Sequence, residues 1–172
     1  MKFSYALRSA LPAAMLGFVA LGLVSTSAAA QANPATTTFN VTATVVKDCT
    51  VTAAPLPFGS YTGAAVNVSS QISVTCTSGT SYTVGLNAGL YTGNSVTNRQ
   101  MGPTATPTAG GLSYTLLTGS FTGTNWGNTT GSWVSGSGNG ALQPITVYGV
   151  LAAAQYVAPG SYTDTITATV TY

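Results

Sequence analysis

Apolar and polar residues alternate along most of this chain. In the segment ATTTFNVTATVVKDC, residues 35–49, apolar side chains stand at every second position: Phe39, Val41, Ala43 and Val45. Thr and Asn stand between them, and a period of two is typical of a β-strand with one buried face. The apolar face of this predicted strand could enter the core of its own domain or that of a neighbouring molecule.

The same alternation returns in six later segments. They are residues 49–62, 70–77, 80–89, 110–119, 143–151 and 160–172. Gly, Pro, Asn and Ser separate these segments, and none of them has the period of an amphipathic helix. Six or seven short strands with turns between them predict an all-β antiparallel sandwich, with a β-barrel as the alternative.

Two polar stretches interrupt this pattern. Residues 92–111 contain Arg99, and the Gly/Ser/Thr/Asn-rich residues 118–141 contain Trp126 and Trp133. Loops of this length without regular structure are uncommon in compact domains. We therefore expect the first stretch to be a long polar connection and the second to contain a small hairpin near Asn128.

The chain begins with a basic start, an apolar middle at residues 10–24 and a run of small residues. This order predicts a secretory signal peptide, cleaved after Ala30 or Ala32. A membrane anchor is the alternative, but the apolar run is short for a membrane span. No later segment is apolar for long enough to span, so we expect no membrane insertion after cleavage.

Charged residues make up only 3% of the chain. Removal of the signal peptide leaves four charged side chains, and these are Lys47, Asp48, Arg99 and Asp164. A nucleic-acid partner is disfavoured because the chain has no basic patch. A neutral surface rich in Thr offers little repulsion between copies, which favours packing against copies of itself.

Two cysteines remain after cleavage, Cys49 and Cys76. Secretion into an oxidising compartment predicts that they form a disulfide between neighbouring strands. The bridge would close a loop of about 27 residues and contribute roughly 3.5 kcal/mol in the chain-entropy account. A metal or redox pair is the alternative, which the absence of His disfavours.

The residue inventory argues against an enzyme. The chain has no His, so Ser-His-Asp and Cys-His catalysis are excluded, and its only acidic residues are Asp48 and Asp164. We expect no cofactor and no metal site, since a calcium site usually needs several carboxylates. Trp126 and Trp133 could stack on a sugar ring, or they could cover the core of the sandwich from a loop.

Several motifs occur in an order that resembles the spore coat protein U domain family. They are FNVTATVVKDCTV, LPFGSY, ISVTCTSGTSYTVGLNAG, RQM, LSYTLL, WG, ITVYG and GSYTDTITATVTY. This family includes subunits of archaic chaperone–usher pili in bacteria. The resemblance extends over nearly all of the chain that follows the predicted signal peptide.

The resemblance implies an immunoglobulin-like sandwich that lacks its last strand. A periplasmic chaperone first fills the open groove, and the N-terminal extension of the next subunit then replaces it at an outer-membrane usher. Carried over, residues 1–30 are the signal peptide, 31–46 the extension and 47–172 the pilin domain. The implied donor residues are Phe39, Val41, Ala43 and Val45. The implied acceptor groove and chaperone-binding residues are Ile166, Ala168, Val170 and Tyr172.

The implied function is that of a structural subunit of a surface pilus, formed by copies of the chain and supporting adhesion and biofilm formation. One domain suits a shaft or adaptor position in the fibre. The chain stops at Tyr172, at the end of an apolar strand, and we expect nothing further to cover that strand. The alternatives are a secreted coat protein of a spore or cyst and a glycan-binding module that uses Trp126 and Trp133.

Overall fold

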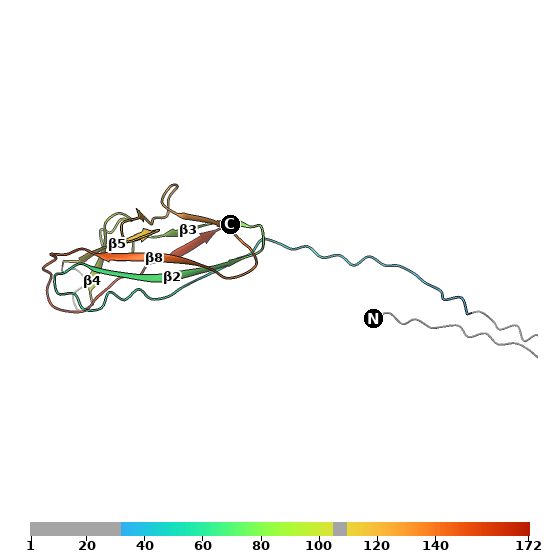
Figure 1. The fold of residues 1–172 in the computed structure, drawn as a ribbon, viewed down its shortest axis with the longest axis horizontal. Coiled ribbons are helices and arrows are strands. Elements are labelled where there is room, and N and C mark those ends of the chain that lie inside the picture. The colour runs from blue at the N-terminus through green and yellow to red at the C-terminus, as the bar shows by residue number, and fades with distance from the viewer. Residues whose placement is uncertain (1–31, 105–109) are drawn as a thin grey trace, which may run out of the picture. The chain divides into compact units, whose positions relative to one another are not determined.

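The computed structural model describes residues 32–104 and 110–172, and the predicted signal peptide lies outside this part of the chain. All regular structure in the described residues is β-structure (Figure 1). The strands are β1 (Cys49–Ala53), β2 (Val66–Cys76), β3 (Ser81–Leu86), β4 (Arg99–Pro103), β5 (Leu112–Thr118), β6 (Thr124–Asn125), β7 (Val134–Ser137), β8 (Gln143–Leu151), β9 (Tyr162–Thr163) and β10 (Ala168–Thr171). The described part contains no helix that is long and apolar enough to cross a membrane.

The strands form two antiparallel sheets. The larger sheet has the order β1-β2-β8-β5-β4-β9, with β6 paired to β5, and the smaller has the order β10-β3-β7. The longest ladder joins β2 to β8, from Val66 opposite Leu151 to Val74 opposite Gln143. The prediction of an all-β antiparallel sandwich is confirmed.

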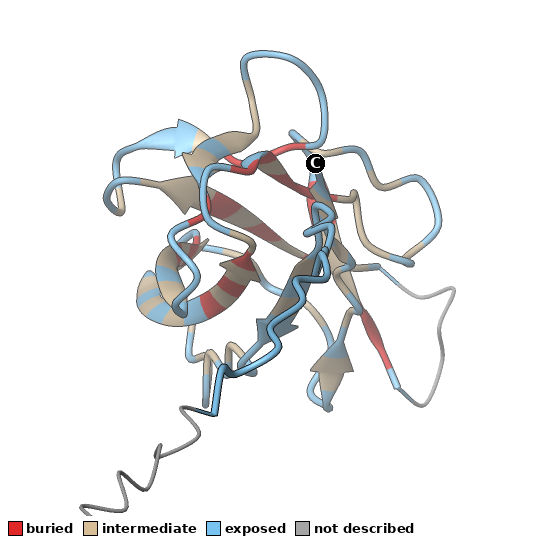
Figure 2. Ribbon diagram, turned by 90° about the vertical axis from the view of Figure 1, so that its right-hand side faces the viewer, coloured by how far each residue is buried: buried red, intermediate tan, exposed pale blue. Residues whose placement is uncertain are grey.

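The core lies between the two sheets and follows the alternation of the sequence. Its buried residues come from both sheets, and red marks the buried positions along the ribbon in Figure 2. They are Ile72, Val74, Cys76, Tyr82, Val84, Leu86, Leu112, Tyr114, Leu116, Trp126, Val147 and Leu151. In β2 and β5 the residues between them are more exposed, as expected for a sheet with one solvated face, whereas in β3 and β8 Gly85 and Gly149 are buried as well.

The two polar stretches differ from their predictions. Residues 92–111 are not a plain connection, because β4 lies within them and pairs with β5. The hairpin expected near Asn128 is also wrong: β6 pairs with β5, and β7 pairs with β3 in the other sheet. Alternation could not reveal these strands, because β6 and β4 are short and β4 contains Arg99, Gly102 and Pro103.

The segment before Cys49 forms no strand in the described residues. The structure divides into two compact units, with the boundary between Thr42 and Ala43. Residues 32–42 of the first unit are exposed and have no regular structure, and residues 43–48 of the second unit precede β1 in the same irregular state. The alternating run of residues 35–49 therefore reaches a sheet only at its last residue.

Candidate functional site: an open strand position in the sandwich

One edge of the sandwich is incomplete on both sheets. β1 is the end strand of the larger sheet and pairs only with β2, while β10 is the end strand of the smaller sheet and pairs only with β3. The two strands contact each other without forming a ladder. Among the described strands, none occupies the position between them, so each keeps a row of unpaired backbone groups at this edge.

A groove of about 380 Å³ opens at this edge and reaches the core. One wall is the end of β1 and the residues after it: Ala53, Ala54, Pro55 and Leu56. The other wall leads into β10: Asp164, Thr165, Ile166 and Ala168. Its floor consists of core side chains: Ile72, Leu86, Met101, Tyr114, Leu116 and Val147. The groove is therefore largely apolar, and most of its floor consists of side chains of the buried core.

A wider cavity of about 1070 Å³ continues this groove. Residues 55–63, which follow β1, and residues 155–164, which include β9, form most of its lining. Pro55, Leu56, Met101 and Asp164 line both cavities, so the two lie next to each other between the segment after β1 and the segment before β10. Tyr156 stands at its border with 92% of its surface exposed.

The structure places two of the four predicted acceptor residues in this groove. Ile166 and Ala168 line it. Val170 packs against the core and pairs with Val84, and Tyr172 is 51% exposed beyond the end of β10. Sequence reasoning missed the opposite wall and the floor, because those residues come from strands that are distant along the chain.

The predicted donor residues lie on the irregular segment before β1, and none of them is buried. Phe39 is 84% exposed, and Val41 and Val45 are 83% exposed. Ala43 is exposed as well. The alternating apolar side of this segment is therefore exposed in the part of the chain that the structure describes. We call residues 31–46 the arm.

A polar cluster stands at the junction of the two cavities. Asp164 accepts hydrogen bonds from Leu90 N at 2.7 Å, Asn94 Nδ2 at 3.2 Å and the Tyr114 hydroxyl at 2.6 Å. Burial raises the pKa of Tyr114, and the hydrogen bond to Asp164 raises it further. The cluster holds the segment before β10 against β5 and the loop that begins at Leu90.

Arg99 is the buried cation of the sandwich, with only 1% of its surface exposed. Its guanidinium donates to the carbonyl oxygens of Asn87 at 2.8 and 2.9 Å, Val96 at 2.8 Å and Trp126 at 2.7 Å. Burial lowers the pKa of this group, and the nearby Tyr114 and Asp164 act in the opposite direction. The side chain joins β4 to the end of β3 and to the loop after β6.

The two tryptophans have different environments. Trp126 is fully buried, and its Nε1 donates to Val84 O at 2.8 Å. It therefore covers the core and offers no ring face to a sugar, which corrects its interpretation as a glycan contact. Trp133 is half-buried just before β7, where no described feature assigns it a ligand.

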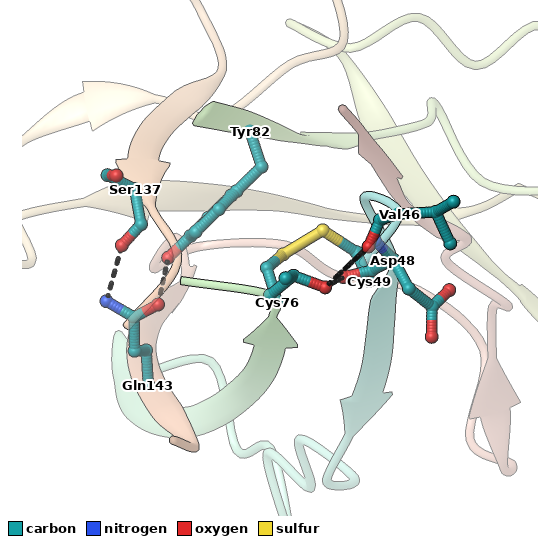
Figure 3. The surroundings of a disulfide bond; sticks show 8 residues. Val46, Asp48, Cys49, Cys76, Tyr82, Ser137 and Gln143 are labelled. Carbon is teal, nitrogen blue, oxygen red and sulfur yellow. Dashed lines mark hydrogen bonds between the residues drawn. A yellow bond between two sulfur atoms is a disulfide. The ribbon is translucent and has the colours of Figure 1, made fainter. Parts of the chain in front are cut away.

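The predicted disulfide is present. Cys49 and Cys76 are bonded and stand directly opposite each other at one end of the β1–β2 ladder. Figure 3 shows the bridge beside Val46 and Asp48, where the chain enters the sandwich. The bridge joins neighbouring strands, as the sequence predicts.

The fold and the open edge define a structural β-sandwich domain. Among the described residues, no group of three or more His, Cys, Asp or Glu side chains comes together. The family model of the Spore Coat Protein U domain matches residues 35–169, a range that includes most of the arm. The chain belongs to this family, as its motifs suggest.

The chain is similar in sequence to one known protein and in fold to a solved structure. Protein U of Myxococcus xanthus is 31% identical over 159 residues, which cover 83% of this chain and 88% of the relative. The chaperone–tip adhesion subunit pre-assembly complex CsuC-CsuE, from the archaic chaperone-usher Csu pili of Acinetobacter baumannii, matches with a TM-score of 0.57 and 25% identity. The match covers 75% of this chain and 41% of the matched chain, so it spans about two-fifths of that chain's length. The family and the fold are those of structural coat and pilus subunits.

Proposed function

We propose that the chain is a structural subunit of a bacterial surface pilus of the archaic chaperone–usher type, polymerised by donor-strand exchange. The observation that supports this proposal is the apolar groove between the unpaired edges of β1 and β10. The same chain has an exposed arm with the alternation that an added strand needs. The arm of one copy fills the groove of the next, and repetition makes a fibre.

The physics of strand addition favours this pairing. An added strand gains backbone hydrogen bonds at the open edge and buries every second side chain. Burial of Phe39, Val41 and Val45 would contribute on the order of 1.5–3 kcal/mol each, before the cost of ordering the arm. The polar Thr and Asn residues between them would then face solvent.

The proposed domain order follows from this assembly. Residues 1–30 are a signal peptide, residues 31–46 are the donor arm, and residues 47–172 are the acceptor body. The arm precedes Cys49, so it can leave the body without opening the disulfide loop. Donation and acceptance therefore use separate parts of one chain.

A periplasmic chaperone would protect the groove before assembly, and an outer-membrane usher would be the site of exchange. One solved structure that is similar to this chain is a chaperone–subunit complex, which supports a chaperone as the first partner. The finished fibre would lie at the cell surface and support attachment and biofilm formation. One sandwich with one groove suits a shaft or adaptor position.

Deletion of residues 35–46 tests the proposal. The shortened chain, co-expressed with the chaperone, is expected to form a soluble one-to-one complex, because its groove is intact. It is expected to form no chains, because it has nothing to donate. Size-exclusion chromatography with light scattering gives the stoichiometry, and the full-length chain is the control.

Two results would contradict the proposal. A stable, folded, free monomer of the shortened chain would show that the groove needs no partner. Fibres from the shortened chain would show that the arm is not the donor.

A protein of a spore or cyst coat is the second candidate function. The family description and the similarity to Protein U favour it. A coat protein would lie in a layer around a resting cell, whereas a pilus subunit would lie in thin filaments. Immunogold electron microscopy of the producing cell separates the two.

A further inference from the structure

The arm joins the sandwich at a cluster of covalent and polar contacts. Cys49 is the first residue of β1 and stands opposite Cys76, the last residue of β2, so the first pair of this ladder is a disulfide. Thr77 N donates to Asp48 O at 2.9 Å. Thr77 Oγ1 accepts from Asp48 N at 3.1 Å and donates to Val46 O or Asp48 O, each 3.3 Å away. We call Val46, Asp48, Cys49, Cys76 and Thr77 the arm anchor; Figure 3 labels all of them except Thr77.

The anchor is connected to the longest ladder of the sandwich. Behind Cys76, β2 is an inner strand that pairs with β1 on one side and with β8 on the other. The turn after Cys76 is held by the segment before β8: Gly140 N donates to Cys76 O at 3.1 Å, and Gly138 N donates to Thr80 O at 2.8 Å. That turn leads into β3, so the anchor is joined to both sheets.

β1 by itself is weakly held. It is an edge strand of five residues and hydrogen-bonds only to β2. Its last residue, Ala53, and the following Ala54 line one wall of the groove. If β1 separated from β2, the groove would lose that wall.

We propose that the arm anchor transmits tension from the arm to β2 and so protects the subunit's own groove from opening under force. This inference rests on the proposed function, in which each arm is pulled by the neighbour that holds it. Because the hydrogen bonds of an antiparallel ladder run perpendicular to its strands, a pull across the ladder at one end loads the pairs one after another, beginning with the first. Here the first pair is covalent, so the separation of β1 cannot begin.

Single-fibre stretching tests the inference on fibres of the full chain. Dithiothreitol reduces the disulfide after assembly: two electrons and two protons from the dithiol yield the Cys49 and Cys76 thiols, and the reagent closes to its cyclic disulfide. Mass spectrometry after iodoacetamide treatment confirms that both thiols have formed. Reduced fibres are expected to rupture at lower force than oxidised fibres, while unloaded fibres keep their length.

Two variants separate the parts of the anchor. Thr77→Val keeps the disulfide and removes the side-chain hydrogen bonds to Val46 and Asp48, so it is expected to lower the rupture force less than reduction does. Thr75→Val is the matched control, because Thr75 lies in β2 opposite Thr50 and outside the anchor. Its rupture force is expected to equal that of the unchanged chain.

Equal rupture forces for reduced and oxidised fibres, with both thiols alkylated, would overturn the inference and leave the proposed function intact. Loss of subunits from reduced fibres without any load would also overturn it, because the bridge would then maintain the groove at rest. Failure of the full chain to form any fibre would overturn the proposed function and this inference together.

Discussion

At the scale of single residues, buried polar groups decide how the loops attach to the sandwich. Arg99 satisfies carbonyl oxygens from three segments, and the Trp126 indole donates to Val84 O. Within the described residues, no buried side-chain nitrogen or oxygen lacks a hydrogen-bond partner. Arg99 and Trp126 hold the two long polar stretches in place, although the composition of these stretches is typical of loops.

Substitution of Arg99 by methionine tests this role. Arg99→Met keeps an apolar stem but leaves the carbonyl oxygens of Asn87, Val96 and Trp126 without a donor. We expect the free energy of unfolding to fall by roughly 3–5 kcal/mol, because each unpaired buried group costs about 1–3 kcal/mol. Urea unfolding followed by tryptophan fluorescence measures the change. Lys47→Met, at an exposed position, is the control, and an equal loss there would contradict this role.

Tyr114 makes the free energy of unfolding depend on pH in the alkaline range. Its pKa in the folded state lies above the ordinary value of 10.0, mainly because the hydroxyl is buried. The unfolded chain therefore loses this proton first, so the stabilisation is complete below about pH 10 and declines above it, by about 1.4 kcal/mol per pH unit. Urea unfolding at a series of pH values measures the decline.

Tyr114→Phe is expected to be less stable at neutral pH, because it lacks the hydrogen bond to Asp164, and to show a shallower alkaline decline. Tyr156→Phe is the control, since this side chain is 92% exposed, and it is expected to keep the full decline. An identical alkaline slope in Tyr114→Phe and the unchanged chain would rule out Tyr114 as the source.

At the scale of elements, the same alternation has two outcomes. In β2, β3, β5 and β8 it places one face of each strand in the core. In the arm it produces an apolar face that remains exposed. Alternation determines which side chains share a face, whereas the presence of a partner strand determines whether that face is buried.

We expect a substitution by Asp to have different effects on the two faces of the arm. Val41→Asp places a charge on the face that would enter the groove, where burial of an unpaired carboxylate is costly. It is expected to reduce fibre yield strongly and to leave chaperone binding nearly unchanged. Thr42→Asp, one residue away on the other face, is expected to retain most of the yield. Electron microscopy and quantitative immunoblotting measure both, and equal losses would contradict the assigned faces.

At the scale of the whole molecule, the proposed assembly requires one chain to combine a donor and an acceptor, and this combination is what would make it polymerise. Neither part works without a second copy in the proposed assembly. The low charge of the chain is consistent with close packing of copies, because little electrostatic repulsion opposes it.

Separating the two roles predicts a dimer. The chain without residues 35–46 can only accept, and Ala168→Phe, which fills the groove, can only donate. Refolded together, the two are expected to give a discrete species of two subunits, while neither forms chains alone. Light scattering measures the size. Thr169→Phe, at an exposed position of β10, is the control and is expected to form long chains with itself; long chains of Ala168→Phe alone would contradict the assigned groove.

Local pattern was enough to predict much of the sandwich. The segment of residues 143–151 coincides with β8, and the two cysteines available after the predicted cleavage are bonded. The strand is a local feature of the sequence, and each of the two cysteines has only the other as a partner. The family assignment was also accessible, because the order of the motifs is a property of the sequence. Donor and acceptor roles for the named residues stay predictions.

Only the tertiary structure decided which strands are neighbours. It placed β6 and β7 in different sheets, buried Arg99 and Trp126, and left the edges of β1 and β10 unpaired with a groove between them. The reason is that a period of two identifies a strand and its buried face, but it says nothing about the strand on either side. Pairing depends on contacts between residues far apart along the chain, and so does a missing neighbour.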